Sequence, residues 1–366
     1  MMIVQKNALI NICLVILSSM VSIAIGYSAL KYFTRVPEDT VYRGRNNEYL
    51  LAFYNRKGEK ISEINGALHL LIDPFTIYVN YPNQRSLSYS INKYGFRDGY
   101  ASDKPYIAMV IGGSAAFGFA LDDSEKTFVS KVSRNSQKYN VINSAVVGFL
   151  SGQELSQMVH YLDDFNPSLY IVFDGWNDIY DPYSFTKSWP AVHPPIGYNN
   201  AFFMIEDRLS AYFQMTRKEK DSHVVTLYPA SEPLDENMYF QKIVDTYISN
   251  ISKMHSFAKA RGAEFLLIFQ PELGNKKVHS PGEQDILKTW VGKYEYGDRK
   301  ITERYKALIN EGKKFFEAKN ISFIDINAEP GFSENPQTLF YDVVHPNELG
   351  HDIIAKIINQ LLVKRF

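Results

Sequence analysis

The feature that most constrains the fold is an alternation of apolar runs and amphipathic stretches that begins at Pro105. Five apolar runs have the length and composition of strands and cover residues 106–111, 139–143, 168–173, 264–269 and 321–326. Helical patterns cover residues 124–136, 152–164, 240–261, 299–318 and 349–363. In the second pattern one face carries Leu155, Met158, Val159 and Leu162. Continuous apolar strands that alternate with helices predict an α/β fold whose parallel sheet is covered on both faces.

The loops that follow these strands are where a site is expected, because such sheets bind ligands at the carboxyl ends of their strands. After the first strand, IGGSAAFG places Ser114 at the turn into a helix. Glycines allow a sharp turn there, and a helix N-terminus offers unpaired N–H groups to an oxyanion. Taken alone, the segment also fits a tight turn with a capping serine. It is not a G-x-S-x-G motif, because Ala116 replaces the second glycine.

Two further loops contain candidate hydrogen-bond donors. NSAVVGFLSG follows the second strand and contains Gly148 in mid-loop. FDGWNDIYD follows the third strand and contains Asn177, a side-chain amide at the carboxyl end of that strand, with Gly175 allowing close backbone approach. Each loop, taken alone, also fits an ordinary turn.

The loop before the last helix reads YDVVHPNELGH and contains Asp342 and His345. At this spacing a carboxylate can accept the imidazole Nδ1–H, which fixes the tautomer and leaves Nε2 free to act as a base. Pro346 and Asn347 would open the final helix in either case. We interpret His351 as a helix-packing residue rather than a second base.

Together the four loops contain all the groups that acyl transfer requires. Ser114 is the candidate nucleophile, His345 the general base and Asp342 its orienting carboxylate, while the glycine and asparagine loops supply oxyanion donors. The chain order Ser, Asp, His is shared with α/β-hydrolases, but there the Asp and His lie on separate loops. Here both lie on one loop.

This arrangement resembles the SGNH hydrolases, also called the GDSL superfamily of esterases and lipases. Its four name-giving residues match Ser114, Gly148, Asn177 and His345, and the family's Asp three residues before the His matches Asp342. The resemblance covers about residues 105–366, with a long insertion near 180–240. The GDSL signature departs from the family pattern, since it reads GGSA. The preceding INKYGFRD resembles a lead-in of membrane-anchored bacterial members.

The resemblance implies a flavodoxin-like, three-layer α/β/α sandwich and a serine esterase mechanism. In that mechanism His345 accepts the proton of Ser114, which attacks an ester carbonyl, while Asp342 stabilises the imidazolium. The oxyanion would be held by the backbone N–H groups of Ser114 and Gly148 and by the Asn177 side chain. Neither a metal nor an organic cofactor is implied.

The N-terminal segment carries an uncharged run, Ala8–Leu30, that would span roughly 35 Å as a helix, enough for a bilayer core. We interpret it as an uncleaved membrane anchor, with cleavage after Gly26 as the alternative. The basic residues that follow favour a cytoplasmic domain by the positive-inside rule, yet large domains often translocate despite such bias. We expect an extracytoplasmic domain. The predicted division is therefore an anchor at 1–35, a β-rich lead-in at 36–104 and a catalytic domain at 105–366.

Composition excludes several other classes. Lys and Arg total 39 and Asp and Glu total 40, and this balance disfavours a nucleic-acid binder. The single cysteine, Cys13, excludes an intrachain disulfide and a cysteine-based zinc site.

Four functions remain open for the site. We expect an esterase that deacylates an extracytoplasmic carbohydrate; the alternatives are a glycan O-acyltransferase, a non-catalytic glycan-binding or assembly protein, and a lipase or phospholipase. The insertion after Asn177 is rich in aromatic residues, whose rings with polar tips suit a sugar. Trp189, in a loop sequence of that insertion, is the candidate substrate contact.

Overall fold

The structure, a computed structural model, describes residues 103–185, 236–293 and 299–365 together with most of residues 68–97. Its centre is a sheet of five parallel strands in the order β4-β3-β5-β6-β7. The strands are β3 (Tyr106–Gly112), β4 (Tyr139–Asn143), β5 (Leu169–Asp174), β6 (Glu264–Phe269) and β7 (Phe323–Asp325). This is the strand order of flavodoxin, and it confirms the predicted parallel sheet.

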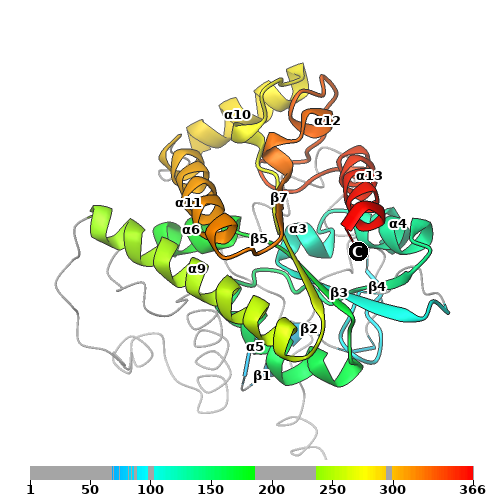
Figure 1. Ribbon diagram of the computed structural model, residues 1–366. Helices are drawn as coiled ribbons and strands as arrows, with labels where there is room; N and C mark the ends of the chain where they lie inside the picture. The colour runs from blue at the N-terminus through cyan, green and yellow to red at the C-terminus, as the bar shows by residue number, and fades with distance from the viewer. Residues whose placement is uncertain are drawn as a thin grey trace, which may run out of the picture.

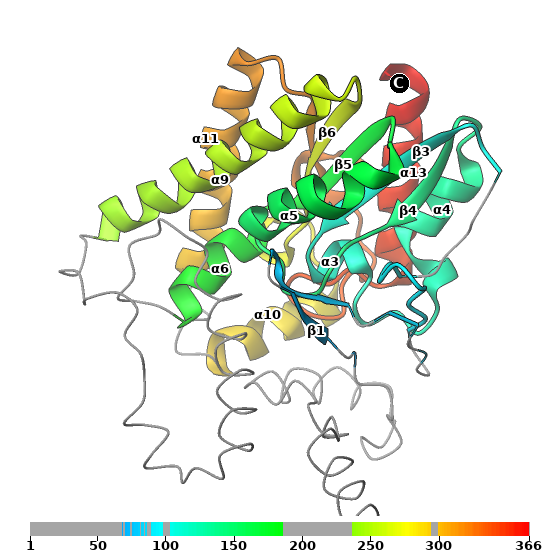
Figure 2. The same ribbon diagram turned by 90° about the horizontal axis from the view of Figure 1, so that it is seen from below.

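Helices cover both faces of this sheet, as the apolar strands require. One face is covered by α4 (Phe128–Asn135) and α13 (Glu348–Arg365), and the other by α5 (Ser151–Gln157), α9 (Glu236–Ala260) and α11 (Arg299–Ala318) (Figures 1 and 2). Every residue of β5 is buried, because this central strand has helices on both sides. The predicted three-layer sandwich is confirmed.

The strand register brings the predicted loops to one edge. Gly112 of β3 lies opposite Phe173 of β5, and Asn143 of β4 lies opposite Val110 of β3. The loops that follow these three strands therefore leave the sheet close together. The order reverses between β3 and β5, which is where open α/β sheets bind their ligands.

Some element boundaries differ from the prediction for local reasons. The last strand is shorter than predicted, because the Asp325 carboxylate accepts the N–H of Asn327 and starts a 3₁₀ turn at Ile326–Ala328. The helix predicted over residues 124–136 is divided, because Thr127 caps a new helix at Phe128 by accepting the N–H of Ser130.

The predicted apolar face of the helix over residues 152–164 is only partly buried. Met158 and Leu162 are fully buried, whereas Val159 is exposed. The backbone changes from α-helix to π-helix over Met158–Leu162, so the side chains no longer follow a 3.6-residue period.

Three described helices lie outside the predicted helical stretches, one of them the four-residue α12 (Pro330–Ser333). Helix α10 (Pro281–Lys293) begins with a capping box, in which the Ser280 hydroxyl accepts the Glu283 N–H and the Glu283 carboxylate accepts the Ser280 N–H. The Ser-Pro-Gly-Glu sequence was the available signal for this start. Helix α6 (Trp176–Phe185) begins directly after β5, so Asn177 lies in the first turn of a helix rather than in a loop.

A two-stranded antiparallel hairpin precedes the sheet. It consists of β1 (Leu70–Asp73) and β2 (Ile77–Asn80), whose turn lies against α5: the Gln153 side chain donates to the Thr76 carbonyl at 2.9 Å. Both strands lie within the predicted lead-in at residues 36–104.

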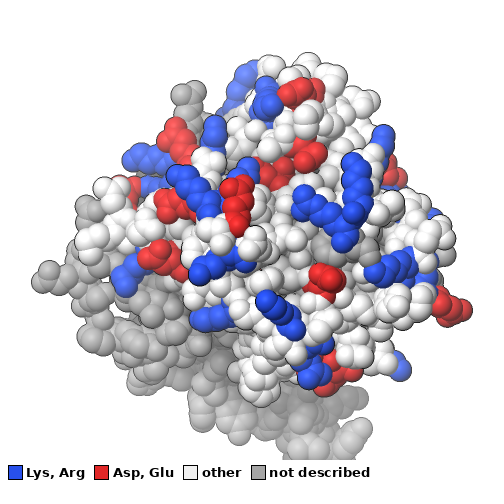
Figure 3. Space-filling model, viewed as in Figure 1, with Lys and Arg blue, Asp and Glu red and all other residues white. Residues whose placement is uncertain are grey.

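The described helices include none that is long and apolar enough to cross a membrane. The predicted anchor at residues 1–35 lies outside the described residues, as does most of the insertion after Asn177. On the face shown in Figure 3, Lys and Arg side chains lie among Asp and Glu side chains rather than forming one positive field.

Candidate active site

Ser114 is the first residue of the short helix α3 (Ser114–Phe117), directly after β3. The two preceding glycines permit close packing at this turn. A Cβ atom on Gly112 would lie 2.4 Å from the Phe173 carbonyl oxygen, and one on Gly113 would lie 2.5 Å from Asn177 Nδ2. A side chain at either position would push β5 or Asn177 away from the serine.

His345 and Asp342 lie on the loop before α13 and reach the serine from the far end of the chain. His345 Nε2 lies 2.8 Å from Ser114 Oγ, and His345 Nδ1 lies 2.6 Å from Asp342 Oδ2. The other Asp342 oxygen accepts the N–H groups of Val344 and His345 at 2.8 and 2.9 Å. The three side chains therefore form one continuous hydrogen-bonded chain in the order Ser, His, Asp.

The surroundings keep the Asp342 carboxyl ionised. Burial raises its pKa, but the adjacent His345 and the hydrogen bonds from His345 and Val344 outweigh burial, so the net pKa lies below its usual value. The Phe119 ring lies 5.1 Å from the His345 ring and packs beside it. An ionised Asp342 fixes the tautomer that leaves His345 Nε2 available to Ser114.

Asn177 and the loop that contains Gly148 lie against Gly113, the residue before Ser114. Asn177 Nδ2 donates to the Phe149 carbonyl at 2.8 Å, which connects the start of α6 to the loop that contains Gly148. Gly148 has a φ of +79°, a conformation that favours glycine. In the described part of the chain, no acceptor is found for the backbone N–H groups of Ser114 and Gly148.

The structure thus brings together Ser114, Gly148, Asn177, Asp342 and His345. Trp189 lies outside the described residues. His351 is fully buried in α13, where its Nδ1 accepts the N–H of Phe128 at 3.0 Å and its ring stacks on the Phe128 ring. Burial holds the pKa of His351 well below its usual value, so this residue joins α13 to α4 as a neutral side chain.

The INKYGFRD segment has a physical role that its sequence does not reveal. Arg97 is buried, and its guanidinium donates to the carbonyls of Phe117, Gly118 and Leu121 at 3.0, 2.6 and 3.0 Å. These carbonyls lie at the end of α3 and just beyond it. Arg97 therefore holds the short helix that begins at Ser114.

A buried acidic cluster behind the site was also missed. Asp178 accepts the N–H and hydroxyl of Ser151, the latter at 2.5 Å, and so connects the residue after Asn177 to the start of α5. Burial raises the pKa of Asp178 to about 6. Burial and the neighbouring carboxylates Asp174 and Asp178 raise the pKa of Glu154 well above its usual value.

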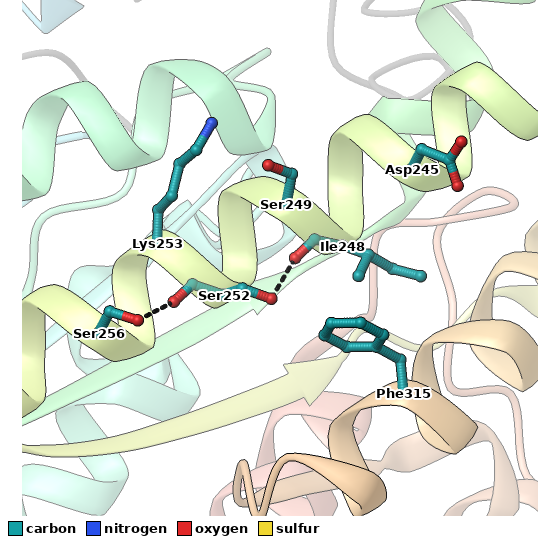
Figure 4. Close-up of a pocket in the computed structure, with 7 residues that line it drawn as sticks. All are labelled: Asp245, Ile248, Ser249, Ser252, Lys253, Ser256 and Phe315. Carbon is teal, nitrogen blue, oxygen red and sulfur yellow. Dashed lines mark hydrogen bonds between the residues drawn. The ribbon is translucent and has the colours of Figure 1, made fainter.

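A separate groove lies on the outer surface between α9 and α11 (Figure 4). Its volume is about 610 Å³, and it is lined by Asp245, Ile248, Ser249, Ser252, Lys253, Ser256 and Phe315. None of these residues belongs to the hydrogen-bonded chain around Ser114.

Comparison with known families identifies the fold and the chemistry. Residues 86–358 match the family of GDSL-like lipases and acylhydrolases. The chain belongs to this family. All five site residues lie in the matched stretch, and the resemblance drawn from the sequence is confirmed. As a GDSL-like hydrolase, the protein is an ester hydrolase.

Two solved structures are among those similar to part of the chain. A GDSL-like lipase from Bacteroides thetaiotaomicron is 16% identical, with a TM-score of 0.41, over 71% of this chain and 89% of that one. A catalytic mutant of an acetylxylan esterase from Geobacillus stearothermophilus is 16% identical, with a TM-score of 0.40, over 71% of this chain and 95% of that one. No curated protein matches the chain.

Proposed function

We propose that this GDSL-like hydrolase is a serine esterase whose catalytic triad is Ser114, His345 and Asp342. The observation that carries the proposal is the continuous contact from Ser114 Oγ to His345 Nε2 at 2.8 Å and from His345 Nδ1 to Asp342 at 2.6 Å. A nucleophile, a base and an orienting carboxylate at these distances are what acyl transfer needs.

The reaction follows from these positions. Ser114 Oγ attacks the ester carbonyl carbon as its proton passes to His345 Nε2, and the imidazolium then donates that proton to the leaving alkoxide. The oxyanion is held by the N–H groups of Ser114 and Gly148 and by Asn177. A water molecule, deprotonated by His345, then attacks the acyl-enzyme and releases the carboxylic acid and free Ser114.

For the substrate, we propose an acyl ester of a carbohydrate, an acetyl ester in particular. The support is the aromatic composition of the insertion after Asn177, where Tyr and Trp side chains offer apolar faces with polar tips. We further propose that the run Ala8–Leu30 anchors the chain in a membrane and that the catalytic domain is extracytoplasmic.

The test is ester hydrolysis with acetyl and longer acyl chains, on the wild type and on Ser114→Ala. We expect Ser114→Ala to lose nearly all turnover, on the order of 10⁶-fold in kcat, and to resist labelling by a fluorophosphonate. Ser252→Ala, a serine on α9 away from the site, is the matched control and should keep full activity. Labelling that persists in Ser114→Ala would refute the assignment of the nucleophile, and a preference for long acyl chains would favour a lipase.

A further inference from the structure

The hairpin that precedes the family-matched stretch lies against the loop that contains Gly148. In that loop the Phe149 N–H donates to the Val146 carbonyl at 3.2 Å, closing a four-residue turn over residues 146–149. Gly148 is the third residue of the turn and has a φ of +79°. A type II turn requires a positive φ at this position, whereas a type I turn has a negative one.

The central peptide of this turn determines where the Gly148 N–H points. The Val147 carbonyl and the Gly148 N–H belong to one planar peptide group, so whatever holds the carbonyl also orients the N–H. Types I and II differ by a flip of this central peptide. The flip would turn the Gly148 N–H to the opposite side, away from the position in which it serves the oxyanion.

Tyr78 of β2 holds this peptide. Its hydroxyl donates to the Val147 carbonyl at 3.2 Å, and its side chain is only 1% exposed. Its ring packs edge-on against the Phe149 ring at 5.4 Å. A Cβ atom on Gly148 would lie 2.8 Å from the Tyr78 hydroxyl, so the turn and the phenol are in direct contact.

Asn80, on the same strand, holds the other end of the loop. Its fully buried amide donates to the Ala145 carbonyl at 3.1 Å and to the Gly95 carbonyl at 3.0 Å. The next residue, Val146, donates its N–H to Gly112, two residues before Ser114, at 3.0 Å. The hairpin therefore fixes the glycine loop relative to the nucleophile turn.

We propose that Tyr78 is a positioning residue of the oxyanion hole, with Asn80 in support. Its hydroxyl keeps the Val147–Gly148 peptide in the type II orientation and so presents the Gly148 N–H to the oxyanion. The inference rests on the proposed esterase function. Both residues precede residue 86, where the family match begins, so these contacts are made by the lead-in of this chain.

The test is Tyr78→Phe, which removes the hydroxyl and keeps the ring against Phe149. The substrates are 4-nitrophenyl acetate and its thiono analogue, in which sulfur, a weaker hydrogen-bond acceptor, replaces the carbonyl oxygen. Loss of one neutral hydrogen bond should lower kcat on the oxygen ester by roughly threefold to tenfold with KM unchanged. The loss on the thiono ester should be less than about twofold, because the Gly148 N–H stabilises the developing charge on sulfur less strongly.

Controls separate positioning from a general packing defect. Asn177→Ala should also lose more kcat on the oxygen ester than on the thiono ester, and its loss on the oxygen ester should be larger than that of Tyr78→Phe. Tyr139→Phe removes a buried phenol hydroxyl at the opposite end of the sheet and should leave both rates unchanged. If Tyr78→Phe does not fold, Asn80→Ala replaces it in the test. Its kcat should also fall more on the oxygen ester than on the thiono ester.

Equal losses on both esters, or no loss on either, would overturn the role of Tyr78. An inactive wild type would overturn the proposed function itself. A wild type that is active and sensitive to Asn177→Ala, but indifferent to Tyr78→Phe, would overturn only this inference.

Discussion

A buried ion pair near the loop that contains Asp342 and His345 offers a prediction about stability. Lys276 Nζ lies 2.6 Å from Glu283 Oε2, and both side chains are fully buried. The ammonium also donates to the Gln337 carbonyl at 3.0 Å, and the carboxylate accepts the N–H groups of Ser280 and Leu339. The pair thus joins the loop after β6, the start of α10 and the segment that leads to Asp342.

Lys276→Met removes the ammonium and keeps most of the volume, so little of its effect comes from a cavity. It leaves the Glu283 carboxylate buried without its cation. Breaking one partner of a buried pair costs about 3–5 kcal/mol. Because the two backbone N–H groups still bind the carboxylate, we expect the lower end of that range, about 3 kcal/mol of unfolding free energy.

The neighbouring residue provides the control. Lys277 pairs with Glu334 at 2.8 Å, but these side chains are 58% and 50% exposed. Water screens such a pair, so Lys277→Met should cost less than about 1 kcal/mol. The double variant Lys276→Met with Glu283→Gln removes both charges and keeps an oxygen for the Leu339 N–H. It should be less destabilised than Lys276→Met alone.

The assay is urea unfolding followed by tryptophan fluorescence, with free energies from the midpoint and slope of each curve. A loss for Lys276→Met no larger than that for Lys277→Met would refute the argument that burial makes this pair costly to break. A double variant worse than the single one would refute the argument that the orphaned charge is the cause.

Three further predictions concern catalysis, pH and substrate. Asn177→Ala should lower kcat by roughly 10²–10³-fold with little change in KM, because its amide stabilises a negative charge that develops only in the transition state. A change mainly in KM would reassign Asn177 to substrate binding. Burial and the neighbouring carboxylates raise the folded-state pKa of Glu154 well above the ordinary 4.5, so the contribution of this group to stability falls as the pH rises above 4.5. Glu154→Gln lacks this titration and should become more stable relative to wild type as the pH rises from about 5 towards neutral in melting experiments. A pH-independent difference would contradict this. Trp189→Ala should leave hydrolysis of 4-nitrophenyl acetate unchanged but lower activity on an acetylated oligosaccharide by about tenfold, roughly 1.4 kcal/mol. Equal losses on the two substrates would indicate a packing defect.

The alternation of strands and helices was readable from the sequence because it is local. Apolar residues with the period of a strand or a helix reveal which face must be buried, whatever the rest of the chain does. The order of the loops then placed Ser114, Asn177 and His345 at one sheet edge, since parallel strands end on the same side. Glycines before Ser114 were visible for the same reason, because a sharp turn needs them locally.

The contacts that complete the site depend on tertiary structure. Ser114 and His345 are 231 residues apart, and only the assembled fold brings Ser114 Oγ and His345 Nε2 to 2.8 Å. Arg97 and Tyr78 were overlooked as site residues because their partners are backbone carbonyls of distant loops. A carbonyl has the same chemistry at every position, so no side-chain pattern marks which one a buried donor will meet. That choice is made only when the lead-in packs against the sheet.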